Sequence, residues 1–350
     1  MEARQIAFFG ATNSGKSTLV NAIAGQQVSL VSELPGTTTD PVRKRIEIPG
    51  LGLCVLVDTA GYGDEGALGA ERERLTRAVI DSTDVAVLLR SGHKADDDWE
   101  ALLRKAGVPV VEASALVEMT IKRIAEALPR EDERWLTGSL VKAGDSVLLV
   151  MPQDSEAPKG RLILPQVQVI RELLDRGCIP VCCTPASLQG AVASVKPALV
   201  ITDSQVFRLV DETIPAHWPL TSFSVLLAGA KGDLGVFLEG ARAIDTLQPG
   251  ARVLIAEACT HVPDTEDIGR VKIPALLLKR ASVEVDIAAG NDFPEDLGGY
   301  HLIIHCGACV ATSALVRSRT RKALLAGVPI TNYGLALAKL QGIMERISLP

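Results

Sequence analysis

The chain has 350 residues, a formal net charge of −6, a sequence pI of about 5.5 and no basic run. This charge balance argues against a nucleic-acid partner. No apolar stretch reaches the roughly 18 residues of a membrane span, and the first residues lack a signal-peptide pattern, so we expect a cytoplasmic protein without membrane contact. Hydrophobic residues make up 47% and aromatic residues 3%, which favours an α/β fold of parallel sheets covered by helices, in two or three domains.

Alternating apolar runs and helical patterns predict three α/β domains. In the first, strands are expected at 6–9, 42–48, 53–57 and 85–89, with helices at 16–24, 72–80 and 120–128. The second set of runs comprises 146–151, 167–176, 179–183, 198–202 and 206–211. The third comprises 225–227, 236–246, 253–256, 283–287, 302–305, 311–326 and a last helix from Leu335. A charged cluster at 130–134 and a proline-containing stretch at 215–219 place the domains at 1–130, 131–218 and 219–350, with no evident internal repeat.

The first domain opens with a phosphate-binding loop. Residues 10–17, Gly-Ala-Thr-Asn-Ser-Gly-Lys-Ser, match G-x-x-x-x-G-K-[ST] between an apolar strand and a helix, as that motif requires. The glycines let backbone N–H groups turn toward the phosphates, and the helix N-terminus adds a favourable dipole. We expect Lys16 to reach the outer phosphates and Ser17 to bind Mg²⁺. The predicted nucleotide-binding residues of the loop are Gly10, Asn13, Ser14, Gly15, Lys16, Ser17 and Thr18.

Two further segments complete the predicted nucleotide site. Asp58-Thr-Ala-Gly61 follows the strand at 53–57, where Asp58 can hold the magnesium shell and Gly61 can offer its N–H to the γ-phosphate. Between these motifs lies Pro-Gly-Thr-Thr-Thr-Asp at 35–40, a hydroxyl-rich loop in which Thr38 is the expected magnesium ligand. Lys16, Thr38 and Asp58 are therefore the predicted catalytic residues.

These motifs resemble those of the MnmE and Era groups of GTPases. That resemblance implies that Asn13 helps to bind K⁺ beside the phosphates. Such GTPases read guanine through an N-K-x-D motif after a further strand, but the nearest string here, His93-Lys94-Ala95-Asp96, follows the strand at 85–89 and lies one strand too early. The segment 107–116 runs almost directly into what resembles the S-A-[KL] loop, so the intervening strand is predicted to be deleted or fused. Residues 93–96 are either a degenerate base reader or a solvated loop, and the choice between GTP and ATP stays open.

A cysteine and histidine constellation marks the last domain. The chain has seven cysteines, an odd number that excludes a complete disulfide framework. Cys259-Thr-His261 and, after 43 residues, His305-Cys306-Gly-Ala-Cys309 each follow a predicted strand, and the carboxyl ends of parallel strands meet at one edge. Thiolates select zinc or iron–sulfur clusters. Three cysteines and a histidine satisfy zinc, whereas a 4Fe–4S cluster would leave one iron for histidine, water or an exchangeable group. A redox dithiol or buried cysteines are the alternatives.

The combination of both sites resembles the HydF family, the GTPase maturation factors of FeFe hydrogenase. Further segments that carry the resemblance lie at 35–42, 151–161, 267–274, 292–296 and 327–334. The family implies a GTPase domain, a dimerisation domain and a domain that binds a 4Fe–4S cluster. It also implies a slow, regulatory GTPase and a homodimeric carrier that receives a two-iron precursor from radical SAM maturases and delivers it to the apo-hydrogenase.

The same resemblance assigns the cluster ligands. Cys259, Cys306 and Cys309 match the family's cluster cysteines, and His261 and His305 are the candidates for a labile fourth position. His305 is slightly preferred because it adjoins two of the thiols. Two alternatives remain: a P-loop NTPase with structural zinc that acts in RNA modification, and an interaction protein that does not hydrolyse nucleotide.

Overall fold

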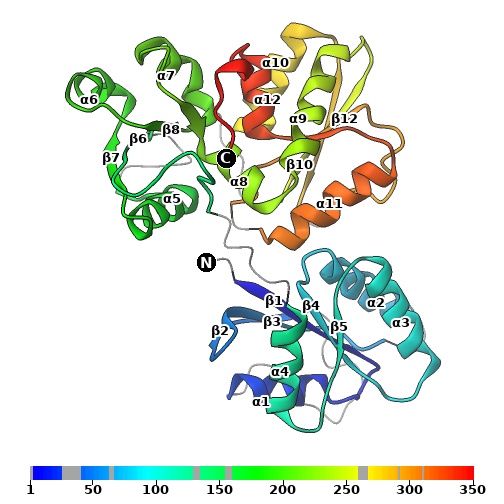
Figure 1. Cartoon of the computed structure of the whole chain (residues 1–350). Helices are drawn as coiled ribbons and strands as arrows, with labels where there is room; N and C mark the ends of the chain where they lie inside the picture. The colour runs from blue at the N-terminus through cyan, green and yellow to red at the C-terminus, as the bar shows by residue number, and fades with distance from the viewer. Residues whose placement is uncertain are drawn as a thin grey trace. The chain divides into compact units, whose positions relative to one another are not determined.

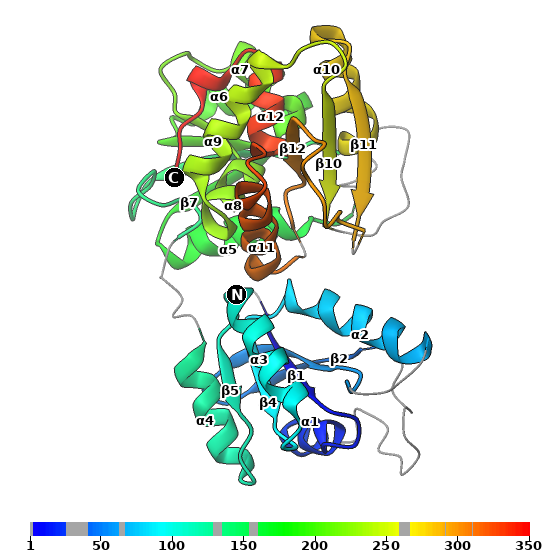
Figure 2. The ribbon, with the colours of Figure 1, turned by 90° about the vertical axis from the view of Figure 1, so that its right-hand side faces the viewer.

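The computed structural model describes residues 3–25, 41–62, 67–128, 135–153, 160–258, 267–290, 292–309 and 311–350, with the backbone alone at 67, 68 and 71. It divides into two compact units, Met1–Asp132 with Thr312–Ser318, and Glu133–Ala311 with Arg319–Pro350. Figures 1 and 2 show both units from two directions. Among the described helices, none is long and apolar enough to cross a membrane.

The first unit is built on one five-stranded sheet of order β2-β3-β1-β4-β5. Its elements are β1 (Arg4–Gly10), α1 (Lys16–Ala24), β2 (Val42–Ile48), β3 (Gly52–Asp58), α2 (Ala67–Ile80), β4 (Val85–Leu89), α3 (Lys94–Lys105), β5 (Val110–Glu112) and α4 (Val117–Ala127). Only β2 is antiparallel to its neighbour. In Figure 1, α1 and α4 lie on one face of this sheet and α2 and α3 on the other.

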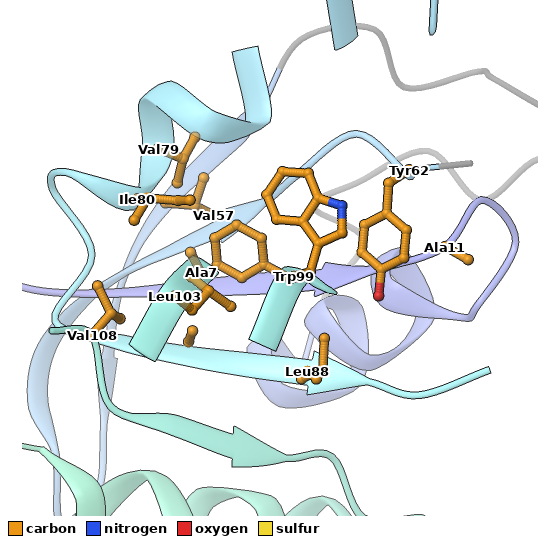
Figure 3. Close-up of a cluster of buried hydrophobic side chains, with 12 residues drawn as sticks. Ala7, Ala11, Val57, Tyr62, Val79, Ile80, Leu88, Trp99, Leu103 and Val108 are labelled. Atoms are coloured by element: carbon orange, nitrogen blue, oxygen red, sulfur yellow. The ribbon is translucent and has the colours of Figure 1, made fainter. Parts of the chain in front are cut away.

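The central strand β1 is buried on both faces because its apolar side chains alternate between two cores. Ala7 and Phe9 belong to the core under α2 and α3, whereas Ile6 and Phe8 belong to the core under α1 and α4. Figure 3 shows the first of these cores, with the Trp99 ring at its centre. A strand covered on both faces by helices is typical of parallel α/β domains.

The helix α3 contradicts the prediction of a solvated loop at residues 93–96. These residues are not a solvated loop, because His93 is the N-cap of α3 and the helix begins at Lys94. Trp99 and Leu103, one helical turn apart, are buried against the sheet and hold α3 in place despite its charged sequence. The short strand β5 pairs with β4 and leads directly into the segment that resembles the S-A-[KL] loop.

The second unit contains two four-stranded sheets of entirely parallel strands, in the orders β7-β6-β8-β9 and β11-β10-β12-β13. The first sheet's elements are β6 (Ser146–Val150), α5 (Leu164–Asp175), β7 (Ile179–Cys183), α6 (Leu188–Ser194), β8 (Leu199–Thr202), α7 (Phe207–Thr213), β9 (Leu220–Ser222) and α8 (Phe223–Lys231). The second sheet's elements are α9 (Leu234–Arg242), β10 (Arg252–Glu257), α10 (Ile273–Arg280), β11 (Glu284–Ala289), β12 (Leu302–His305), α11 (Ser313–Leu325), β13 (Ile330–Asn332) and α12 (Tyr333–Leu340). Figure 2 shows β10, β11 and β12 side by side.

The two sheets of the second unit are a structural repeat, although none was expected from the sequence. Each has its strands in the order second, first, third, fourth, and each last strand ends in an N-cap of the following helix. Ser222 caps α8 by accepting from Val225 N, and Asn332 caps α12 by accepting from Leu335 N. The repeat therefore places β8 and β12 at equivalent positions, and with them the turns that follow.

Two predictions about the boundary between the middle and last domains need correction. The apolar run 225–227 lies inside α8, and β9 pairs with β8 although it lies beyond the predicted boundary at 218. The prolines near 215–219 belong to the connection between α7 and β9 rather than to a linker between domains.

Candidate functional site

The phosphate-binding loop lies between the end of β1 and the start of α1. Asn13 and Gly15 adopt positive φ angles of 64° and 90°, the left-handed backbone that such a tight turn requires. The Lys16 ammonium is buried and donates to Gly10 O at 2.9 Å and to Ala11 O at 2.8 Å. The predicted loop is thus formed, with its lysine held against the loop's own carbonyls.

Asp58 stands beside this loop because β1 and β3 are neighbours in the sheet. Phe8 is in register with Asp58, and Ser17 Oγ donates to Asp58 Oδ2 at 2.6 Å. The Asp58 side chain is completely buried, and within the described residues its Oδ1 atom has no hydrogen-bond partner. A hydroxyl and a carboxylate with a spare oxygen are the hard oxygen donors that Mg²⁺ takes, so the residues present fit this ion.

Gly61 touches the phosphate-binding loop directly. A Cβ atom at Gly61 would lie 2.5 Å from Thr12 Cα, so only glycine fits there. Tyr62 N donates to Gly10 O at 3.4 Å, and Thr12 N donates to Tyr62 O at 3.1 Å. The structure therefore brings the predicted residues Gly10, Asp58 and Gly61 together, whereas Thr38 lies outside the described residues.

Tyr62 is a residue of this site that the sequence analysis missed. Its hydroxyl donates to Asp96 Oδ1 at 2.6 Å, and its ring stacks on Trp99 with centroids 5.3 Å apart. Burial, the hydrogen bond and the charge of Asp96 raise the pKa of Tyr62 well above its ordinary value. Figure 3 shows Tyr62 beside Trp99 at the edge of the core. Its signal in the sequence was an aromatic directly after Gly61, but its partner helix α3 was not predicted.

Asp96 binds the Tyr62 hydroxyl and is not available to contact a nucleotide base. It is 1% exposed and also accepts from Ser91 N at 2.8 Å and Gly92 N at 3.0 Å. Burial alone would raise the pKa of Asp96, but these hydrogen bonds outweigh burial and lower it. A carboxylate held in this way inside the domain is not available to guanine, so residues 93–96 are not a base reader in this structure.

The second candidate site lies at the carboxyl ends of β10 and β12. Cys306 follows β12 directly, and Ala258 N, just after β10, donates to Cys306 Sγ at 3.1 Å. Ala258 is the residue that precedes Cys259 in the sequence, and this contact places Ala258 at the turn that begins with Cys306. Cys259 and His261 themselves lie outside the described residues. Within those residues, no group of three potential metal ligands is assembled.

His305 is engaged through both ring nitrogens. Arg319 Nη1 lies 3.3 Å from His305 Nε2, and His305 Nδ1 lies 2.8 Å from Cys306 O. Because a guanidinium can only donate, Nε2 accepts from Arg319 and Nδ1 carries the proton that is donated to Cys306 O. The ring is 1% exposed, so binding iron through Nε2 would require Arg319 to move. Its role as a ligand stays a prediction.

The fold and the loop geometry define a P-loop GTPase domain followed by two parallel α/β domains, and the family comparisons agree. A model described as "50S ribosome-binding GTPase" matches residues 5–115. Models of the hydrogen maturase F dimerization domain and tetramerization domain match residues 136–232 and 235–350. The chain belongs to the hydrogen maturase F family. It therefore carries a GTPase domain and two domains of a kind associated with oligomerisation.

Individual relatives match the GTPase part. The chain is 36% identical to the tRNA modification GTPase MnmE of Myxococcus xanthus over 144 residues, which are 40% of this chain and 31% of that protein. It is 43% identical to MnmE of Acidiphilium cryptum over 88 residues, 25% of this chain and 20% of that protein. The chain thus spans less than a third of these relatives. Era of Aquifex aeolicus, solved with GDP and aluminium fluoride, is similar at 15% identity and a TM-score of 0.30, covering 90% of this chain and 100% of that chain.

Proposed function

We propose that the chain is a scaffold and carrier for the two-iron subcluster of FeFe hydrogenase, and that it binds a 4Fe–4S cluster and hydrolyses GTP to regulate its partner interactions. The observation that carries this proposal is the hydrogen bond from Ala258 N to Cys306 Sγ. In a chain of the hydrogen maturase F family, this contact brings the segment that precedes Cys259 to the turn that holds Cys306 and Cys309.

In the nucleotide site, each residue has a separate role. Lys16 exchanges the carbonyls of Gly10 and Ala11 for phosphate oxygens when nucleotide binds. Ser17 and Asp58 would hold Mg²⁺, and Thr38 would close over it. Bound Mg²⁺ neutralises charge on the phosphates. Within the part of the chain that the structure describes, Asp58 Oδ1 is buried without a hydrogen-bond partner, and this supports the assignment because such an oxygen is costly unless a ligand satisfies it.

The remaining nucleotide contacts follow from the same loop. The backbone N–H groups from Gly10 to Thr18 and the start of α1 would hold the phosphates. Asn13, held at positive φ, would contribute to a K⁺ site beside them. Guanine preference rests on family membership, because the chain has no N-K-x-D motif.

In the cluster site, Cys259, Cys306 and Cys309 would each bind one iron, leaving one position for another ligand. Arg319 and Cys306 O occupy the nitrogens of His305, which favours His261 or an exogenous ligand for that position. A weakly held fourth ligand suits a carrier, because a two-iron precursor needs an open coordination site.

The proposed partners are radical SAM maturases, which would supply the two-iron precursor, and apo FeFe hydrogenase, which would receive it. A homodimer formed through the middle domain is the proposed working form, in keeping with the dimerization model that matches residues 136–232. We expect neither nucleic acid nor a membrane as a partner. A site made of thiols suits the reducing cytoplasm.

Anaerobic iron–sulfur reconstitution of the full chain tests this proposal. The wild type should take up about four irons per chain and show the EPR signal of a reduced cluster. Cys306→Ser and Cys309→Ser should lose that signal, whereas Cys182→Ser, a change at an exposed cysteine of β7, should retain it. Stoichiometric zinc without an iron signal would refute the carrier function and favour the alternative, an NTPase with a structural zinc that acts in RNA modification.

A further inference from the structure

A buried lysine holds the turn that carries the two described thiols. Lys231 is the last residue of α8, and its side chain is 7% exposed. Its ammonium donates to Ala308 O at 2.7 Å, to Ala311 O at 2.8 Å and to Cys309 O at 3.4 Å. These contacts enclose the Cys306–Cys309 turn from one side.

The turn needs such support because its backbone is strained. Ala308 has a φ of 51°, a conformation that costs an alanine about 1 kcal/mol or more. Ala308 is also 2% exposed, so its carbonyl cannot rely on bulk water. The bond from Lys231 satisfies this carbonyl and keeps the residue in the left-handed region between the two cysteines.

The helix that presents the lysine is fixed at its start. Ser222 caps α8 by accepting from Val225 N at 3.2 Å, and the Asn332 side chain donates to Ser224 O at 2.9 Å. The family comparisons place Lys231 within the dimerization domain, whereas the cysteine turn lies within the tetramerization domain. The middle domain therefore supplies a charge to the proposed cluster site of the last domain.

We propose that Lys231 is a positioning residue of the cluster site, which shapes the Cys306–Cys309 turn and raises the reduction potential of the bound cluster. The inference rests on the proposed function, since it presupposes a cluster on these thiols. A buried ammonium is costly, and thiolates of the same turn compensate its charge better than carbonyl dipoles alone. Because reduction adds negative charge to the cluster, a fixed cation nearby favours the reduced state.

The test compares Lys231→Met, which removes the charge but keeps most of the length, with Lys231→Arg, which keeps the charge. Lys279→Met is the matched control, because Lys279 is exposed near the end of α10, in the domain that carries the cysteine turn. Each full-length variant is reconstituted anaerobically, and its iron content and midpoint potential are measured by EPR-monitored redox titration. These readouts do not depend on maturation activity.

Lys231→Met should take up less iron than the wild type. Its midpoint potential should be lower by about 59 mV, which for one electron is a tenfold shift of the cluster toward the oxidised form. Lys231→Arg should recover most of that shift, and Lys279→Met should match the wild type. Equal midpoint potential and iron content in Lys231→Met and Lys279→Met would overturn the inference. If Lys231→Met fails to fold, a folded Lys231→Arg whose midpoint potential lies about 59 mV or more below the wild-type value would overturn the inference, because this variant keeps the charge. Failure of the wild type to take up iron would instead refute the cluster itself.

Discussion

Replacing Tyr62 by phenylalanine removes one hydroxyl from a buried contact and leaves the aromatic ring in place. The hydroxyl lies 2.6 Å from Asp96 Oδ1, and both side chains are at most 4% exposed. A hydrogen bond to a charged group contributes about 1.5–3 kcal/mol. Asp96 keeps the N–H groups of Ser91 and Gly92, so it is not left wholly unsatisfied. Tyr62→Phe should therefore lower the unfolding free energy of the first unit by about 2 kcal/mol.

Trp99 fluorescence can measure this loss within the full chain. The other two tryptophans, Trp135 and Trp218, lie in the second unit, so changing both to phenylalanine leaves a reporter of the first unit alone. Denaturant unfolding is compared for Tyr62→Phe, Asp96→Asn and the double variant, and the cycle should give a coupling of at least about 1 kcal/mol. Additive single effects, or a loss below about 0.5 kcal/mol for Tyr62→Phe, would refute the reasoning.

The same contact should depend on pH with a defined sign. The folded pKa of Asp96 is lowered, so its contribution to stability is complete above the unfolded value of about 3.9 and is lost as pH falls through the folded value. The stability difference between the wild type and Tyr62→Phe should thus be largest at neutral pH and shrink below about pH 4. A difference that grew on acidification would contradict the assignment of Asp96 as an ionised acceptor.

Two further predictions concern packing and hydrolysis. Gly240→Ala should destabilise the second unit by about 3 kcal/mol or more, because the new Cβ would lie 1.9 Å from Ile330 O, whereas Gly190→Ala, with nothing within 4 Å, should be near neutral in thermal unfolding. An equal melting temperature for both variants would contradict the α9 packing. Asp58→Asn should reduce magnesium-dependent GTP hydrolysis, measured by phosphate release, by about 10²-fold or more. Wild-type turnover in this variant, with Ser17→Ala equally active, would contradict the proposed magnesium site.

Much of the nucleotide site could be predicted from the sequence because its contacts are local or follow from one strand pairing. The loop from Gly10 to Ser17 lies within a single strand-to-helix turn, and Asp58 ends the neighbouring strand. The contact of Tyr62 with Asp96 and Trp99 could not be predicted, because both of these partners lie in α3. That helix has a largely charged sequence, which obscured the apolar residues on its buried face, Ala95, Trp99, Leu102 and Leu103.

The repeat in the second unit was missed for a different reason. Its two copies share strand order and helix caps, but the residues at the equivalent turns differ: Asp203 follows β8, whereas Cys306 follows β12. Topology can persist where side chains diverge. The role of Lys231 was equally hidden, because a lysine is usually a surface residue and its nearest carbonyl partner lies 77 residues away in sequence.

The most direct test of the account is the maturation of an apo FeFe hydrogenase under anaerobic conditions, with the full chain co-expressed with radical SAM maturases and hydrogen evolution as the readout. We expect activity with the wild type and with Cys182→Ser, and loss of activity with Cys306→Ser. Full hydrogen evolution without this chain, or with Cys306→Ser in its place, would contradict the proposal that these thiols carry the cluster of a hydrogenase maturation scaffold.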